Sequence, residues 1–216
     1  MKINPLLKKL IVEFLGVTLF LTAIGAAISS SGTQLATAGI AITLGLAILV
    51  TGGISGGHLN PIVSLYFFSK KELSLSEFFG YIVAQIAGGL VGIWIGLSIW
   101  GKTVGSLANG RNATLPELIG EWVITGGLVF LVGFLASNKK GNLIPLAVAL
   151  WVFAGLQLTS TGAQANPAVT IALLLAGHDT GVQGGLIIAQ VVGAACGIIG
   201  INVFNAKAVK AKKTTK

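Results

Sequence analysis

Apolar residues gather in six long runs along the chain, and short polar or charged segments separate these runs. The runs cover residues 10–29, 36–53, 78–100, 119–137, 142–160 and 182–204. A helix needs about 20 apolar residues to cross a bilayer, and each run comes close to or exceeds that length. The pattern therefore predicts an all-α membrane protein with six transmembrane helices.

Two shorter apolar pieces, 61–69 and 167–176, each follow an Asn-Pro pair. Asn60 precedes Pro61, and Asn166 precedes Pro167. Asn is favoured as the residue that caps a helix start and Pro as the first helical residue, so each pair predicts a helix. At about 1.5 Å per residue, such a piece covers roughly half of a ~30 Å hydrocarbon core. Broken helices of this kind line cavities in membrane proteins, which indicates a channel or a transporter.

The two halves of the chain repeat one another. Glu13 and Glu121 head the first and fourth apolar runs, Asn60 and Asn166 begin the half-helices, and Ala-Gln pairs end at Gln85 and Gln190; the offsets are 108, 106 and 105 residues. Nearly constant offsets indicate one unit used twice. Each unit holds three full spans, an odd number, so the second unit must enter the bilayer from the opposite face. We therefore expect a single channel domain over 1–216, with inverted repeats at about 10–100 and 119–204.

The composition agrees with a membrane protein, and the charges predict its orientation. Of the 216 residues, 54% are hydrophobic and only 9% are charged, which is far too apolar for a soluble domain. The net charge of +8 lies almost entirely between or beyond the apolar runs, so it indicates topology rather than nucleic-acid binding. One side of the membrane would hold 12 of the 14 basic residues, namely Lys2, Lys8, Lys9, Lys70, Lys71, Lys139, Lys140, Lys207, Lys210, Lys212, Lys213 and Lys216.

The other side would hold only Lys102 and Arg111. This asymmetry predicts that both termini are cytoplasmic, in a membrane that we take to be the cell membrane. The basic tail, 205–216, is expected to anchor to anionic lipid. The sequence contains no phosphate-binding Gly-rich loop, metal-ligand cluster or nucleophile with a base, so we expect neither an enzyme nor a cofactor or metal.

The repeat parity brings the two half-helices into the bilayer from opposite faces, where they can meet at the midplane. Their unpaired N–H groups and helix dipoles would make this point electropositive. The side-chain amides of Asn60 and Asn166 would offer donors there to a passing polar molecule.

At these residues the sequence resembles the aquaporins, the family of major intrinsic proteins. The resemblance includes the Glu-headed spans, the segment Ser55–Pro61, the second motif Asn166-Pro167-Ala168 and the Ala-Gln pairs, and it covers almost the whole chain. It implies six tilted helices and two re-entrant half-helices around a single-file pore, in a homotetramer with one pore per subunit. It also implies pore-lining carbonyls from Gly56, Gly57 and His58 on the inner side and from Gly162, Ala163 and Gln164 on the outer side.

The chain departs from the family pattern at the places that control selectivity. Ile62 stands where the first motif usually ends in Ala, and Val169 stands where an Arg usually follows the second motif. Counted from the motifs, the other positions of the outer constriction are Ile40, Ala154 and Ala163. All four constriction residues are apolar, without Arg, His or an aromatic ring. We therefore expect a wider, apolar outer constriction, which leaves the Asn-Pro region as the main barrier.

The resemblance also suggests roles for the polar residues inside the spans. Glu13 and Glu121 are expected to accept hydrogen bonds that hold the re-entrant segments, and Gln85 and Gln190 to orient the backbone of these segments. The lone Cys196 lies in an apolar run and is expected in the core. His178 and Asp179, which follow the second half-helix, are expected in a solvated loop.

The function predicted from these features is a passive channel for water and other small neutral molecules. Three alternatives remain at this stage. The channel could mainly carry another neutral solute, such as ammonia, a small polyol or hydrogen peroxide. The inverted repeats could form a secondary transporter, which would need buried ionisable groups for ion coupling. The bulk of Ile62 could also occlude the pore, which would leave a structural membrane protein.

Overall fold

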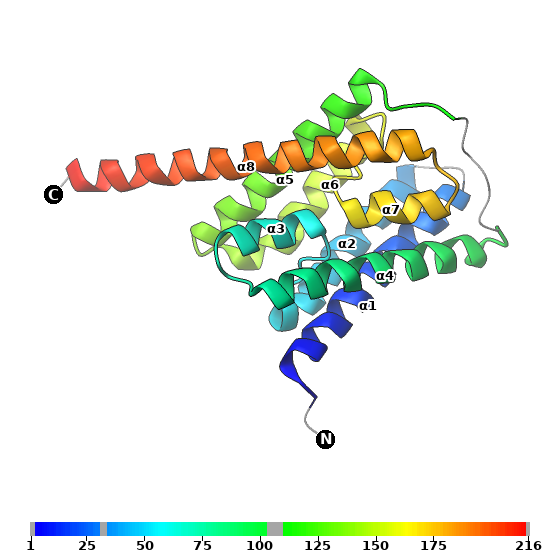
Figure 1. Cartoon of the computed structure of the whole chain (residues 1–216), viewed down its shortest axis with the longest axis horizontal. Coiled ribbons are helices and arrows are strands. Elements are labelled where there is room, and N and C mark those ends of the chain that lie inside the picture. The colour runs from blue at the N-terminus through cyan, green and yellow to red at the C-terminus, as the bar shows by residue number, and fades with distance from the viewer. Residues whose placement is uncertain (1–2, 31–33, 103–109, 215–216) are drawn as a thin grey trace.

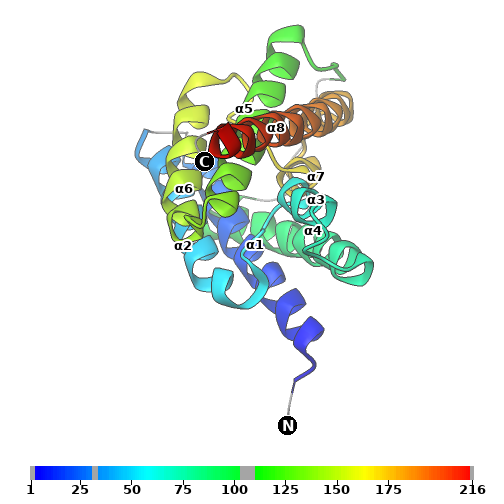
Figure 2. The same ribbon diagram turned by 90° about the vertical axis from the view of Figure 1, so that its left-hand side faces the viewer.

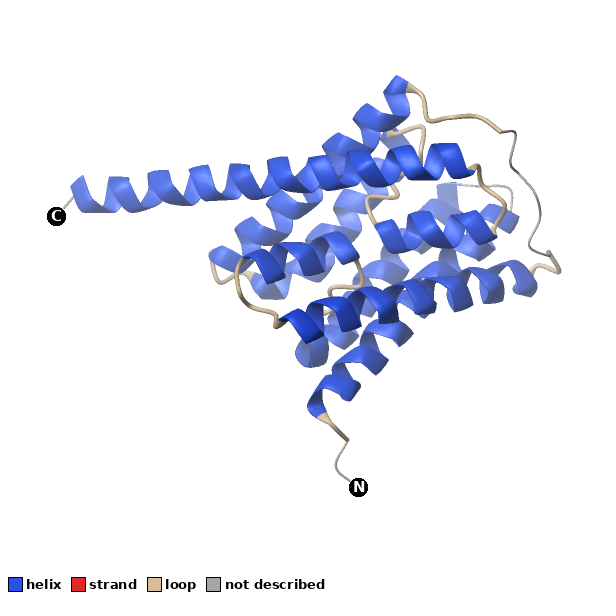
Figure 3. Ribbon diagram, viewed as in Figure 1, coloured by secondary structure: helices blue, strands red, loops and turns tan. Residues whose placement is uncertain are grey.

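The computed structural model describes residues 3–30, 34–102 and 110–214. The helices follow in the order α1 (Pro5–Ser29), α2 (Gln34–Ser55), α3 (Pro61–Ser69), α4 (Leu75–Ile99), α5 (Leu115–Ser137), the 3-10 turn η1 (Gly141–Leu143), α6 (Ile144–Leu158), α7 (Pro167–Leu175) and α8 (Thr180–Thr214). No strand occurs among these described residues (Figure 3). Six of the described helices are long and apolar enough to cross a membrane, which confirms the predicted fold class.

The helices match the predicted runs, but three of the spans begin three to five residues earlier than predicted. Helices α1, α4 and α5 start at positions 5, 75 and 115 rather than 10, 78 and 119. Their first turns contain charged residues, Lys8, Glu77 and Glu117, which interrupt the hydrophobic pattern. Capping explains these starts: Asn4 Oδ1 accepts from Leu6 N (2.9 Å), and in α4 Ser74 and Glu77 cap each other reciprocally.

The half-helices begin as predicted, at Pro61 and Pro167. The predicted basic tail is not separate, because α8 continues through position 214; residues 215–216 lie outside the described part. In Figure 1 the end of α8 extends well beyond the rest of the bundle.

Two crossed helix pairs, α1 with α4 and α5 with α8, form the most extensive contacts of the fold. Both crossings bring backbones together at glycine. A Cβ on Gly88 would lie 2.4 Å from Phe14 O, and one on Gly193 would lie 2.4 Å from Trp122 O. Small residues at such crossings let membrane helices approach closely, and these two glycines occupy matching places in the two halves.

The half-helices α3 and α7 fill the space between the crossed pairs. Figure 1 shows them between α4 and α8, and the turned view in Figure 2 places α2 and α6 on the opposite side of the molecule. Each half of the chain thus contributes two long helices, one half-helix and a further long helix, in the same order.

Apolar residues occupy both the core and much of the outer surface, and a few polar side chains are buried within. The side chains of Glu13, Gln85, Glu121 and Gln190 are fully buried, whereas many large apolar residues, such as Leu46, are exposed on the outer surface. Such an apolar exterior requires a lipid or protein environment, which agrees with an integral, multi-pass membrane protein.

Candidate functional site

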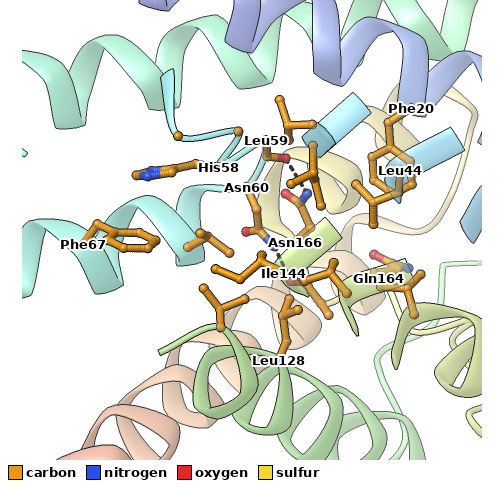
Figure 4. A pocket seen from close by; sticks show the side chains of 18 residues that line it. Phe20, Leu44, His58, Leu59, Asn60, Phe67, Leu128, Ile144, Gln164 and Asn166 are labelled. Atoms are coloured by element: carbon orange, nitrogen blue, oxygen red, sulfur yellow. Dashed lines mark hydrogen bonds between the residues drawn. The ribbon is translucent and has the colours of Figure 1, made fainter. Parts of the chain in front are cut away.

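The starts of the two half-helices meet and are hydrogen-bonded to each other. Asn60 Nδ2 donates to Ala165 O (2.8 Å), and Asn166 Nδ2 donates to Leu59 O (2.9 Å) (Figure 4). Each bond runs from one half of the chain to the backbone residue just before the other half's Asn. The structure therefore brings these two Asn side chains together at the centre of the fold.

Each Asn also caps its own helix. Asn60 Oδ1 accepts from Ile62 N (2.9 Å), and Asn166 Oδ1 accepts from Ala168 N (2.9 Å). A side-chain amide carries two N–H donors, and the cross-contact uses one of them. One donor on each Asn thus remains for a molecule in the adjoining cavity, and the amide oxygens are held away from that role.

Glu13 holds the segment that leads into α3. Its carboxylate accepts from Ser55 Oγ (2.6 Å), His58 N (2.9 Å), Leu59 N (2.8 Å) and Gln85 Nε2 (2.7 Å). Four bonds satisfy the lone-pair sites of a carboxylate that is fully buried. They also hold Leu59 in a left-handed conformation (φ 48°), which is unfavourable for a residue other than glycine.

Glu121 does the same for the segment that leads into α7. It accepts from Thr161 Oγ1 (2.5 Å), Gln164 N (2.9 Å), Ala165 N (2.7 Å) and Gln190 Nε2 (2.8 Å). Ala165 is left-handed as well (φ 44°). The contacts that were expected for the two Glu residues are therefore present in both halves. The amides of Gln85 and Gln190 do not bond the backbone of these segments directly: each donates to the Glu carboxylate and to a hydroxyl of the half-helix, Ser64 or Thr170.

A cavity of about 50 Å³ lies around the two Asn residues. It is lined by Gly56, Gly57 and His58, together with apolar residues of α1, α2, α5 and α6 (Figure 4). A second cavity, of about 290 Å³, is lined by Gly162, Ala163 and Gln164. The loop residues that were expected along the two halves of a pore thus line these two cavities: the first three line only the small one, Gly162 and Ala163 only the larger one, and Gln164 both.

Three residues line both cavities: Phe20, Val152 and Gln164. The two cavities adjoin at these residues, and we call this place the passage. Phe20 was not predicted as a site residue. It lies seven positions after Glu13, two helical turns along α1, so the spacing from the buried Glu could have placed it on the inward face.

Three of the four predicted constriction residues, Ile40, Ala163 and Val169, are buried and line the larger cavity. Ala154 lines neither cavity, and that prediction is wrong. The inward face of α6 is formed by Val152 and Leu156, which are four residues apart. Ala154 lies halfway between them in sequence and therefore on another face of the helix.

Ile62 does not fill the passage. It is buried, and it packs with Tyr66, Val129, Ala194 and Ile201 between α3, α5 and α8. It lines neither cavity. The extra bulk at the first motif therefore goes into helix packing, which removes the reason to expect an occluded pore.

Part of the lining of the larger cavity is polar, which the sequence did not indicate. Arg111 forms a bidentate ion pair with Glu117 (2.9 and 2.8 Å), and both residues line the cavity. Within the described part of the chain, three buried atoms that belong to lining residues have no hydrogen-bond partner: Gln164 Oε1, His178 Nε2 and Gln183 Oε1.

Two further predictions are wrong. Asp179 is buried and accepts from Gly110 N (2.6 Å), so it holds a loop rather than lying in solvent. Burial also lowers the pKa of the neighbouring His178 below its usual value, although the charge of Asp179 opposes the shift. Cys196 is exposed on the outer surface of α8 instead of lying in the core.

Comparison with known proteins adds a family to this geometry. A family model described as "Major intrinsic protein" matches residues 1–161. A probable aquaporin PIP2-6 of Oryza sativa subsp. japonica is 34% identical over 76% of this chain and 68% of its own length. Aquaporin NIP1-2 of Arabidopsis thaliana is 33% identical over 76% of this chain and 62% of its own length.

A bacterial relative and a solved structure extend the range of these similarities. Aquaglyceroporin AqpS of Rhizobium meliloti is 29% identical over 71% of this chain and 68% of its own length. The X-ray structure of the aquaglyceroporin from Plasmodium falciparum matches the fold with a TM-score of 0.70 at 20% identity, and it covers 92% of this chain and 95% of that one. The chain spans about two thirds of the length of the curated relatives that it matches.

Proposed function

Because this chain belongs to the major intrinsic protein family, we propose that it forms a passive channel of the aquaporin type for water and other small neutral solutes. The observation that carries the proposal is the pair of Asn amides, each with one unused donor, in the cavity where α3 and α7 begin. A permeant molecule could accept hydrogen bonds from these donors, in place of those that it loses when it separates from other solvent molecules.

The same arrangement would exclude ions. The N-termini of α3 and α7 both point their partial positive charge at the Asn pair, which opposes the entry of cations. The rest of the narrow cavity is largely apolar, and it would not replace the hydration shell of an ion. Neutral molecules with few hydrogen bonds to replace would meet a lower barrier.

The difference in cavity size supports passage of solutes other than water. The outer cavity is several times larger than the one at the Asn pair, and Val169 lines it where the family pattern has an Arg. We therefore place the main barrier at the Asn pair. Small polyols, ammonia and hydrogen peroxide are the candidate solutes alongside water.

Ion-coupled transport is disfavoured by the state of the buried carboxylates. Glu13 and Glu121 would be the coupling groups, yet each already accepts four hydrogen bonds from the segments that it holds. Neither has a free position for a transported ion.

Topology and assembly complete the proposal. Residues 1–216 would form one channel domain of two inverted repeats, with both termini cytoplasmic in the cell membrane, as the distribution of basic residues suggests. The family resemblance and the exposed apolar faces of the helices support a homotetramer in the lipid bilayer. The proposal includes no nucleic acid, cofactor, metal or enzyme activity.

Stopped-flow light scattering on reconstituted vesicles tests this function. Vesicles with the protein should shrink faster than empty vesicles in an impermeant osmolyte, and in glycerol they should shrink and then re-swell. Fast shrinkage without re-swelling would restrict the channel to water. Rates equal to those of empty vesicles in both solutions would refute the proposed function.

A further inference from the structure

His58 and Gln164 occupy the same position in the two halves, two residues before Asn60 and Asn166. Their backbone N–H groups make equivalent bonds, to Glu13 and to Glu121, each at 2.9 Å. The backbone frame is thus the same at both positions, and only the side chains differ.

The side chain of His58 is engaged by its own half. Its Nδ1 lies 3.2 Å from Ser64 Oγ, and its ring stacks on Phe67 with centroids 4.6 Å apart. These contacts hold the ring against α3 and satisfy one of its two nitrogens.

The side chain of Gln164 has no such contacts. The residues that match Ser64 and Phe67 in the second half are Thr170 and Leu173. The hydroxyl of Thr170 is already bonded to Asn166 O (3.1 Å) and to Gln190 Nε2 (2.9 Å). Gln164 Oε1 is buried without a partner within the described part of the chain.

This free amide lies at the passage between the two cavities. Gln164 lines both of them, together with the apolar side chains of Phe20 and Val152, and Figure 4 shows it among the residues around the Asn pair. A buried amide oxygen without a hydrogen bond is unfavourable, so a molecule that can donate to it gains an interaction. Val169, which stands where the family pattern has an Arg, offers no hydrogen-bonding group.

We propose that the side-chain amide of Gln164 is a specificity-determining group that exchanges hydrogen bonds with neutral, hydroxyl-bearing molecules in the passage. This inference rests on the proposed channel function and refines it. The amide would favour solutes that both donate and accept, and it would offer nothing to apolar molecules of the same size. Water depends on the amide less than a polyol does, because neighbouring waters in a file supply hydrogen bonds that a polyol filling the passage must obtain from the wall.

The test compares Gln164→Met with Gln157→Met in vesicles. Met has nearly the length of Gln but neither its donor nor its acceptor strength. Gln157 is exposed on α6, donates from Nε2 to Thr37 Oγ1 (2.7 Å) and lines neither cavity. Its substitution removes a hydrogen bond away from the passage, which makes it the matched control. Loss of one hydrogen bond should lower glycerol permeability about fivefold, whereas water permeability should fall by less and Gln157→Met should change neither.

A second variant gives an independent readout. Gln164→Glu keeps the size and the acceptor but adds a negative charge, so glycerol should still pass while cation leak rises at least about tenfold in a vesicle potential assay. If glycerol does not cross the wild type, the comparison uses water alone, and Gln164→Met should then lower water permeability.

The outcomes separate the two proposals. Unchanged glycerol-to-water ratios in Gln164→Met, together with no added cation leak in Gln164→Glu, would overturn the role of Gln164 and leave the channel function standing. A wild-type protein without any flux would instead remove the channel function itself.

Discussion

The segments that lead into α3 and α7 are built on the same hydrogen-bond frame, but the α3 segment borders only the small cavity, whereas the α7 segment borders both. In each, a buried Glu receives two backbone N–H groups, a hydroxyl and a Gln amide, and an Asn caps the following helix. The cavity at the Asn pair measures about 50 Å³, and that beside the α7 segment about 290 Å³.

This contrast separates scaffold from selectivity. The frame repeats because both loops need the same support for backbone that forms no regular helix within the membrane. The side chains that face the permeant do not repeat: His58 stacks on Phe67, whereas Gln164 is free at the matching position. The frame therefore fixes where the passage lies, and the differences between the halves determine what passes.

The largest effect is expected from removal of a frame carboxylate. Glu13→Leu and Glu121→Leu each leave two backbone N–H groups buried without partners and remove one of the two hydrogen bonds of a buried Gln amide, which should destabilise the protein by about 3 kcal/mol. Unfolding in detergent measures both variants. If one half tolerated the change while the other unfolded, the two frames would not be energetically equivalent.

The Asn pair is expected to give the next largest effect. Asn166→Asp replaces an amide with an anion and offsets the positive ends of α3 and α7, so cation leak should rise about tenfold, whereas water flux should change less. Asn60→Asp should behave similarly, since the two side chains make matching contacts. Ion leak that stayed at the wild-type level in both variants would locate the ion barrier elsewhere.

The role of the larger cavity can be tested at Val169. Val169→Arg introduces a large cation into the wider cavity and should lower glycerol passage several-fold, with a smaller change in water flux. Val63 holds the matching position in the first half and lines the small cavity, so Val63→Arg should reduce both fluxes. Unaltered fluxes in a correctly inserted Val169→Arg protein would mean that residue 169 does not face the pore.

The smallest effect concerns His178. Burial lowers the pKa of its imidazole below the usual 6.5, although the charge of Asp179 opposes the shift. The imidazole is neutral at pH 7 in the folded state. As the pH falls, His178 takes up a proton in the unfolded chain at a higher pH than it does in the folded protein. Stability should therefore decrease slightly from pH 7 towards pH 5.5. The melting temperature of His178→Gln should depend less on pH over this range; an identical dependence would show that His178 contributes nothing.

Much of the fold was predictable because membrane-spanning length and helix starts are local properties. The half-helices begin at Pro61 and Pro167 as predicted, since Asn-Pro fixes a helix start whatever surrounds it. The family assignment also followed from local motifs and is confirmed by the family model and the aquaporin relatives.

The direction in which a side chain faces was harder to predict than the position of a helix along the chain. Cys196 lies in an apolar run, yet it is exposed, because both the core and the lipid-facing surface of a membrane protein are apolar. Ala154 was placed by counting back from Asn166, but the intervening loop contains left-handed residues at 162, 163 and 165 and does not preserve the rotational register of α6. Asp179 was misplaced because its partner, Gly110, is 69 residues away.

The sequence by itself determined the six spans, the two half-helices, the internal repeat and the residues of the Asn-Pro motifs, since each depends on a local pattern or on its recurrence. Only the tertiary structure decided that Phe20, Val152 and Gln164 meet at the passage, that Ile62 packs away from it, and that Arg111 pairs with Glu117 in the lining of the larger cavity. Those outcomes depend on how the helices cross and rotate against one another, and hydrophobicity along one helix does not encode that geometry.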